Sequence, residues 1–267
     1  MKGKRLDQRL FELGLAESRE KAKATIMSGL VYVNGQKSDK PGTPVPDEAK
    51  IEVRGSACPY VSRGGFKLAK ALSAFNIDVS GCTCIDCGAS TGGFTDVLLK
   101  NGAARVYAVD VGYGQLAWSL RQDGRVVVME RTNARNLTPD MFPESMDLAV
   151  MDLSFISIRL ILPAVHALLR PGGECVCLIK PQFEAGRADV GKKGVVRDRA
   201  VHERVLREMC GFFPTAGYAL AGLDYSPIRG PEGNIEYLAY LKKGGDGGFE
   251  PDIPALVAAS HGELDKA

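Results

Sequence analysis

Four charged side chains stand at apparent element ends: Asp152 and Lys180 end the fourth and fifth predicted strands, Glu236 lies in the last one, and Lys67 precedes the first. A charge at the end of an apolar strand is costly to bury unless it is paired. Two lysines and two carboxylates suit transfer of a group to a ribose hydroxyl, which must lose its proton as it attacks. We expect Lys180 to act as the base, with its pKa lowered by a neighbouring lysine and by partial desolvation. Lys67 would hold the hydroxyl, and Asp152 and Glu236 would orient both amines. The structural alternative is a set of salt bridges at the rim of a sheet.

A glycine-rich turn over residues 86–95 follows the first predicted strand, and Asp110 ends the second, 22 residues after Gly88. Glycines let the backbone approach a ligand, and the acidic residue can accept hydrogen bonds from ribose hydroxyls. Ser90 replaces the middle glycine of a dinucleotide fingerprint, and Asp86 would repel a pyrophosphate. A cationic methyl donor, S-adenosylmethionine, therefore fits better than a dinucleotide or a plain turn. The predicted donor-binding residues are Asp86, Gly88, Ala89, Ser90, Gly92, Gly93, Phe94, Thr95, Asp110, Val111, Asn133 and Asp152.

These residues need a scaffold that brings strand ends together, and the alternation of apolar strands with helices after residue 82 predicts one. Strands are expected at 82–87, 105–110, 125–129, 146–151, 174–180, 219–225 and 235–241, with helices at 93–99, 115–120, 157–169 and 198–213. This order is typical of an α/β protein with a doubly wound, mainly parallel seven-stranded sheet, which binds ligands beyond the carboxyl ends of its strands. Over the 267 residues we predict a small α+β domain at 1–55, a linker at 56–60, the catalytic domain at 61–243, and a flexible tether with a short tail helix at 244–267.

The net charge of the chain is only +2, whereas proteins that neutralise many phosphates often carry a large basic excess. The positive charge is concentrated at the N-terminal end, because residues 1–60 carry 11 Lys and Arg against 8 Asp and Glu. Two predicted helices there expose basic side chains, and a glycine-rich basic loop follows the fifth strand. The predicted RNA-binding residues are Arg5, Arg9, Arg19, Lys21, Lys23, Arg63, Arg187, Lys192 and Lys193; ordinary solvated charges are the alternative.

Two resemblances sharpen these expectations. The ordered pattern Arg5-Leu6-Asp7, Gly14, Ser18-Arg19, Gly29 and Val33-Asn34-Gly35 resembles the RNA-binding module of ribosomal small-subunit protein four. The order of lysine, aspartate, lysine and glutamate resembles the tetrad of FtsJ-like ribose 2′-O-methyltransferases, which have the class I methyltransferase fold. With the runs at 60–68, 88–95, 110–116, 152–157, 180–184 and 233–237, residues 5–242 resemble the TlyA family, although Phe66 stands where that family commonly has His.

The TlyA resemblance implies a cytoplasmic enzyme that methylates cytidine 2′-hydroxyls of ribosomal RNA within ribosomal subunits, with S-adenosylmethionine as donor. The implied substrate is the RNA of the large subunit and, for some members of the family, also that of the small subunit. The resemblance also links the enzyme to susceptibility to capreomycin-type antibiotics. It does not indicate an oligomeric state.

Several competing interpretations stay open. Some members of the family are called haemolysins, but neither a signal peptide nor a membrane span is predicted, and the apolar stretch 153–169 contains Arg159 and Pro163. A non-catalytic RNA-binding factor would need only the N-terminal module. The seven cysteines favour buried thiols and no metal, with a site among Cys82, Cys84 and Cys87 as the alternative. Asn133 suits an ordinary turn nearly as well as an adenine contact. The segment 56–59 is expected to couple RNA binding to donor binding.

Overall fold

The computed structural model describes residues 3–265 except 17, 28, 55–57 and 246–247. The chain divides into two compact units, Met1–Pro59 and Tyr60–Ala267. Residues 56 and 57 of the predicted linker, 56–60, fall outside the described residues, so the coupling assigned to 56–59 stays a prediction. In the part of the chain that is described, no helix is both long and apolar enough to cross a membrane.

The smaller unit packs two helices on short strands. The helices are α1 (Leu6–Glu12) and α2 (Arg19–Met27); the strands form a β3-β2-β5 sheet (Gln36–Lys37, Val31–Val33, Ile51–Val53) and a β1-β4 pair (Lys4–Arg5, Pro44–Val45). Ser18 caps α2, since its Oγ accepts a hydrogen bond of 3.1 Å from the Lys21 amide. Asn34 and Gly35 both have positive φ, which closes the β2–β3 hairpin as their sequence predicts. The unit has its own small core around Leu6, Leu10 and Ile26.

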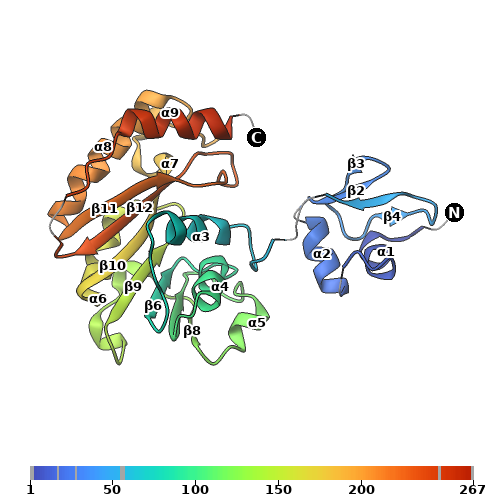
Figure 1. Ribbon diagram of the computed structural model, residues 1–267, viewed down its shortest axis with the longest axis horizontal. Coiled ribbons are helices and arrows are strands. Elements are labelled where there is room, and N and C mark those ends of the chain that lie inside the picture. The colour runs from blue at the N-terminus through green and yellow to red at the C-terminus, as the bar shows by residue number, and fades with distance from the viewer. Residues whose placement is uncertain (1–2, 17, 28, 55–57, 246–247, 266–267) are drawn as a thin grey trace. The chain divides into compact units, whose positions relative to one another are not determined.

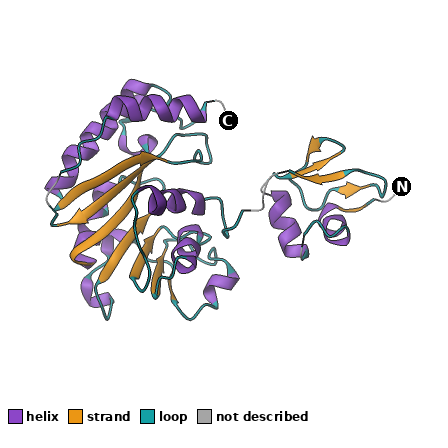
Figure 2. Ribbon diagram, in the orientation of Figure 1, coloured by secondary structure: helices purple, strands orange, loops and turns teal. Residues whose placement is uncertain are grey.

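The larger unit is built on one seven-stranded sheet of order β11-β12-β10-β9-β6-β7-β8 (Figure 2). The strands are β6 (Thr83–Cys87), β7 (Arg105–Val109), β8 (Val126–Met129), β9 (Met146–Met151), β10 (Leu169–Ile179), β11 (Tyr218–Tyr225) and β12 (Tyr237–Lys243). Neighbouring strands are parallel except that β12 runs antiparallel to both β10 and β11. The predicted doubly wound, mainly parallel α/β sheet is confirmed.

Helices cover both faces of this sheet (Figure 1). One face packs on α3 (Gly65–Ala74), α4 (Gly93–Lys100) and α5 (Trp118–Arg121), and the other on α6 (Leu162–Leu168), α8 (Arg199–Thr215) and α9 (Ile253–Leu264). Single helical turns lie at α7 (Pro181–Glu184) and at the 3₁₀ segments Ala134–Asn136, Pro139–Met141, Ile158–Leu160 and Arg187–Asp189. Alternate strand residues point to opposite faces, so Cys84 joins one core cluster and Ile85 the other.

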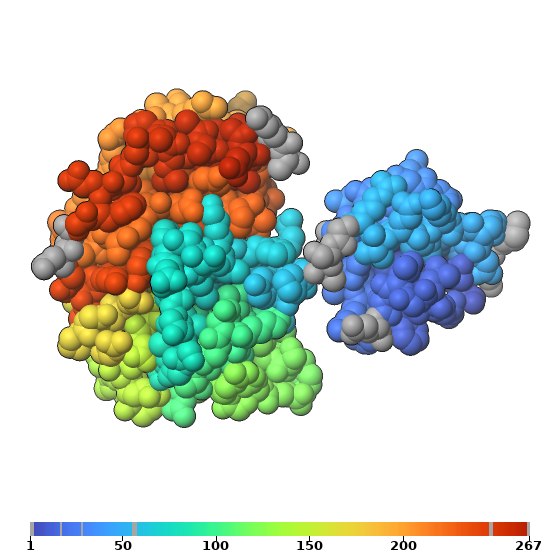
Figure 3. Space-filling model, viewed as in Figure 1, coloured from blue at the N-terminus to red at the C-terminus, as the bar shows by residue number. Residues whose placement is uncertain are grey.

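Two predictions about these elements need correction. The helix predicted over 157–169 begins as a 3₁₀ turn, and α6 proper starts only at Leu162, with Pro163 in its first turn. The segment 244–267 was expected to be a flexible tether with a short tail helix, but that helix is no loose tail, because Ile253, Val257 and Leu264 of α9 are buried in the same core cluster as α8. The space-filling view shows the red C-terminal segment lying against the orange segment that contains α8 (Figure 3).

Candidate active site

The topology brings three charged residues to one edge of the sheet. Asp152 directly follows β9 and Lys180 directly follows β10, which is parallel to it. Glu236 directly precedes β12, whose first residue pairs with the last residue of β10. Because β12 runs in the opposite direction, its beginning meets the carboxyl ends of its neighbours. Glu236 therefore lies one residue before the strand that was predicted to contain it.

Lys67, in the first turn of α3, completes a ring of alternating charges. Its Nζ lies 2.9 Å from Asp152 Oδ2 and 2.6 Å from Glu236 Oε2. Lys180 Nζ lies 2.6 Å from Asp152 Oδ1, 3.8 Å from Glu236 Oε1 and 3.4 Å from Ser154 Oγ. Each carboxylate thus lies within 4 Å of both amines.

The ring is largely withdrawn from water. Glu236 has no exposed side-chain surface, each lysine side chain is 6% exposed, and Asp152 is 19% exposed. Burial by itself would lower the pKa of Lys67, but the charges of Asp152 and Glu236 outweigh it and raise that pKa. Burial would raise the pKa of Asp152, and the two ammonium groups lower it instead. The charged forms of Lys67 and Asp152 are therefore both stabilised by their partners.

Asp86, near the end of β6 and just before the glycine-rich turn, has one carboxylate oxygen that is hydrogen-bonded and one that is not. Its Oδ2 accepts hydrogen bonds from the Thr95 amide at 2.9 Å and the Thr95 hydroxyl at 2.7 Å. Its Oδ1 is buried and has no hydrogen-bond partner among the described residues. Burial raises the pKa of Asp86 to about 7, although Thr95 acts to lower it. An oxygen that is buried and unpaired in this way suits a cationic ligand group.

The loop after β6, here called the donor loop, lies directly against Asp152, one of the four residues of the charged ring. Gly88 has φ +87°, and a Cβ there would stand 3.0 Å from the Asp152 carbonyl oxygen. Asp110, which follows β7, accepts hydrogen bonds from the Ser90 amide at 2.8 Å and the Gly112 amide at 2.7 Å. These bonds hold two close backbone turns beside one acidic side chain. The arrangement fits S-adenosylmethionine, whose adenosine and amino acid ends need such contacts.

The other predicted donor residues divide by burial. Ala89, Gly92, Gly93, Phe94 and Thr95 are buried where the loop enters α4, and Phe94 belongs to the core. Gly92 is required by packing, since a Cβ there would stand 2.2 Å from Leu120. Val111 is 70% exposed. Asn133 caps a 3₁₀ turn by accepting a hydrogen bond of 3.0 Å from the Arg135 amide, which matches its turn interpretation.

The basic residues predicted to bind RNA are mostly exposed, but several have internal partners. Arg5 and Arg19 both bind Asp7, at 3.0 and 3.3 Å, and the Asp7 side chain is fully buried. Arg9 donates to the Asp47 carbonyl at 2.8 Å, and its side chain is only 13% exposed. The remaining candidates, Lys21, Lys23, Arg63, Arg187, Lys192 and Lys193, are exposed. The last two line a cavity of about 360 Å³ with Asp189, Gly191, Val195, Arg197 and Asp198.

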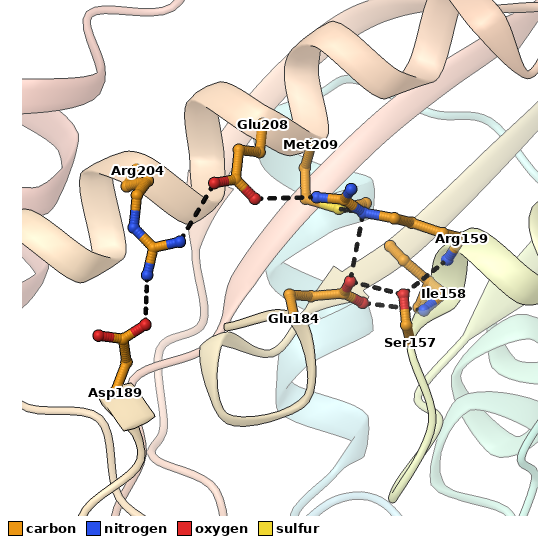
Figure 4. Close-up of polar contacts among 8 residues, drawn as sticks. All are labelled: Ser157, Ile158, Arg159, Glu184, Asp189, Arg204, Glu208 and Met209. Carbon is orange, nitrogen blue, oxygen red and sulfur yellow. Dashed lines mark hydrogen bonds and ion pairs between the residues drawn. The ribbon is translucent and has the colours of Figure 1, made fainter. Parts of the chain in front are cut away.

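Glu184 is a site residue that the sequence did not single out. Its carboxylate accepts hydrogen bonds from Ser157 Oγ at 2.6 Å and the Ile158 amide at 2.8 Å. It thereby joins the segment after Lys180 to the segment after Asp152. Figure 4 shows how the network continues from Glu184 through Arg159, Glu208 and Arg204 to Asp189 in the basic loop. The partners of Glu184 lie 26 and 27 residues away, so local spacing gives no signal for them.

The cysteines give no sign of a metal centre. All seven thiols are free, and Cys84, Cys87, Cys175 and Cys177 are buried in the sheet. Among the described residues, no group of His, Cys, Asp and Glu side chains could hold a metal ion.

Comparison with known proteins identifies both units. Residues 60–243 match the family model of FtsJ-like methyltransferases, and residues 4–51 match the S4 domain. The 16S/23S rRNA (cytidine-2′-O)-methyltransferase TlyA of Mycobacterium tuberculosis is 48% identical over 89% of this chain and 89% of its own length. Hemolysin A of Brachyspira hyodysenteriae is 45% identical over 89% of this chain and 99% of its own length. A solved structure from Streptococcus thermophilus, 48% identical, superposes with a TM-score of 0.80 and covers 100% of this chain and 98% of that one.

These matches agree with the geometry. The class I fold and the N-terminal S4 domain are those expected from the sequence, and the methyl donor is S-adenosyl-L-methionine. The chain therefore belongs to the TlyA family, S-adenosylmethionine-dependent methyltransferases in which an S4 domain precedes an FtsJ-like catalytic domain.

Proposed function

We propose that this enzyme transfers a methyl group to the ribose 2′-hydroxyl of cytidine in large-subunit ribosomal RNA, and that small-subunit RNA is a second substrate. The observation that carries the proposal is the ring of two lysines and two carboxylates, which lies directly beside the donor loop. The relative from Mycobacterium tuberculosis, a 16S/23S rRNA (cytidine-2′-O)-methyltransferase, indicates the nucleotide and the RNA class.

The tetrad would activate the hydroxyl as follows. Bound S-adenosylmethionine supplies an electrophilic methyl on sulfur. Lys180, in its neutral form, would accept the proton of the attacking 2′-hydroxyl. The two close carboxylates keep Lys67 protonated, so that it donates a hydrogen bond to the same oxygen. Asp152 and Glu236 fix the directions of both amines. Base catalysis of this kind contributes roughly 10²–10⁴-fold, with further acceleration from positioning.

Donor binding would use the loop after β6. Asp86 Oδ1 accepts from the donor's amino group, and the carboxylate of Asp110 accepts from the ribose hydroxyls. Gly88 lets the backbone of this turn lie against Asp152, since a Cβ there would stand 3.0 Å from the Asp152 carbonyl oxygen, and the rest of the turn is formed by Ala89, Ser90, Gly92, Gly93 and Thr95.

RNA binding would use the S4 domain together with basic residues of the catalytic domain. In the S4 domain, Arg5 and Arg19 stay half-exposed while Asp7 anchors their guanidinium groups, so they present fixed positive charge to phosphates. Arg9 is less available, because its side chain is mostly buried.

Lys180→Ala tests the mechanism. With purified ribosomal subunits and radiolabelled donor, we expect methyl transfer to be lost while RNA binding and donor binding remain. Lys242→Ala is a matched control, since that lysine is half-exposed and pairs with Glu174. Full activity of Lys180→Ala would refute the base assignment.

Mass mapping of RNA from both subunits would identify the modified nucleotide. Leakage of vesicles caused by the purified protein would instead support the haemolysin interpretation.

A further inference from the structure

Helix α9 lies outside the matched FtsJ-like region, which ends at residue 243, yet it packs behind one member of the tetrad. Ile235 and Tyr237, on either side of Glu236, are buried in the same core cluster as Ile253, Val257 and Leu264. Both neighbours of Glu236 therefore lie in the core that α9 helps to form, and the Tyr237 hydroxyl lies 3.2 Å from Ser260 Oγ of α9, while the Glu236 carboxylate reaches Lys67.

Arg229 connects the end of α9 to the loop that precedes Glu236. Its Nε donates to the Leu264 carbonyl at 3.1 Å, and its Nη1 donates to the Gly233 carbonyl at 2.8 Å. It also pairs with Asp265. A cation on the last carbonyls of a helix is favoured by the helix dipole. One guanidinium group thus holds the end of α9 and the far side of the loop together.

The same loop encloses the Glu236 carboxylate. A Cβ on Gly230 would stand 2.6 Å from Glu236 Oε1, so the backbone beside Arg229 packs directly on that oxygen. Hydrogen bonds of 2.9 Å, from the Gly230 amide to the Asn234 carbonyl and from the Gly233 amide to the Gly230 carbonyl, close the turn. A shift of Arg229 would therefore move the backbone at Gly230, which holds the Glu236 carboxylate beside the two lysines.

A second contact fixes the strand that follows Glu236. His202 Nε2 donates to the Val196 carbonyl at 3.1 Å, which leaves Nδ1 to accept from the Tyr237 hydroxyl at 2.7 Å. Burial lowers the pKa of His202 and favours this neutral form. Ser260 Oγ of α9 lies 3.2 Å from the Tyr237 hydroxyl oxygen.

We propose that Arg229, held by α9, is a positioning residue for Glu236, so that the C-terminal helix is part of the catalytic apparatus. This inference rests on the proposed role of the tetrad. Arg229 touches no reacting group; it acts by keeping the Gly230–Glu236 loop closed on the carboxylate.

The test is Arg229→Met, with Arg207→Met as the control. Arg207 also pairs with a glutamate, Glu203 at 3.5 Å, but on the exposed side of α8. We expect Arg229→Met to lower kcat by about tenfold, with the KM for the methyl donor changed by less than about twofold, and Arg207→Met to leave both unchanged. Circular dichroism and melting temperature check folding. If Arg229→Met does not fold, Asp265→Asn replaces it: this variant removes the charge that Asp265 presents to Arg229 and His261 but leaves both carbonyl contacts of Arg229 in place, and it should show the same split with a smaller loss.

The double variant with Glu236→Gln distinguishes positioning from general stability. If Arg229 acts through Glu236, Arg229→Met costs less than about twofold when Glu236 is already Gln, because the shared contribution has been removed. An equal loss in both backgrounds, or wild-type kcat in folded Arg229→Met, overturns the inference and leaves the proposed function intact. Wild-type activity of Glu236→Gln alone overturns the tetrad assignment and this inference with it.

Discussion

Asp86→Asn should stabilise the donor-free protein while weakening donor binding. The pKa of Asp86 rises from its ordinary value of 3.8 to about 7, chiefly because the carboxyl is buried. In the unfolded chain the Asp86 carboxyl group loses its proton near pH 4, whereas in the folded protein it keeps that proton up to about pH 7. A raised pKa of this kind means that unfolding free energy is lost as pH rises across that interval. At 1.36 kcal/mol per pH unit, the loss reaches about 4 kcal/mol by pH 8 as an upper limit.

The asparagine variant should not pay this cost, because its side chain stays neutral and still accepts from Thr95. Urea unfolding of both proteins from pH 4 to pH 8 should therefore show a stability difference that grows in favour of the variant and levels off above pH 7. The affinity of the wild type for the donor should increase with pH, whereas its stability decreases. If the amino group needs ionised Asp86, donor affinity of the wild type should rise about eightfold from pH 6 to pH 7.5. A stability difference independent of pH, or undiminished donor affinity in Asp86→Asn, would refute this reasoning.

Three further variants test the structure around the site and in the S4 domain. Glu184→Gln keeps one good acceptor but loses the charge that attracts Arg159, so kcat should fall several-fold and unfolding free energy by about 1–2 kcal/mol in steady-state and urea experiments. Asp7→Asn should lower the melting temperature of the S4 domain without changing donor affinity; since arginine contacts lower the pKa of Asp7, the wild-type advantage should be present above about pH 4 and disappear below it. Gly230→Ala should displace the Glu236 carboxylate and reduce kcat at unchanged donor affinity, measured by isothermal titration calorimetry.

The sequence predicts the large-scale fold because strands and helices alternate with clear apolar periods. Asp152 and Lys180 could be placed on one sheet edge because each directly follows an apolar strand, and parallel strands share their carboxyl edge. Glu236 could be placed at this edge only if its strand was known to be antiparallel, and no local sequence pattern shows that direction. The resemblance to a known tetrad supplied that assignment in its place.

Features that depend on distant partners were not predictable from spacing. Glu184 was visible in a motif, but its role depends on Ser157 in another segment. Helix α9 was interpreted as a tail because a glycine-rich stretch separates it from the last strand, and only the packing of Val257 and Leu264 reveals its place in the core. The arginines of the S4 domain were predicted to bind RNA, with ordinary solvated charges as the alternative, and neither interpretation anticipated that Arg5 and Arg19 share one buried carboxylate.

The distribution of the tetrad along the chain has a consequence for biosynthesis. Lys67 precedes the first strand of the large sheet and Glu236 precedes its last, so the four charges span nearly the whole catalytic domain. The S4 domain has its own core and ends by Pro59, 177 residues before Glu236 is made. At roughly 5–20 residues per second, that interval lasts about 10–35 s during translation. For that time the nascent chain carries a complete S4 domain but no assembled tetrad, and a product truncated before Glu236 would compete for RNA without modifying it.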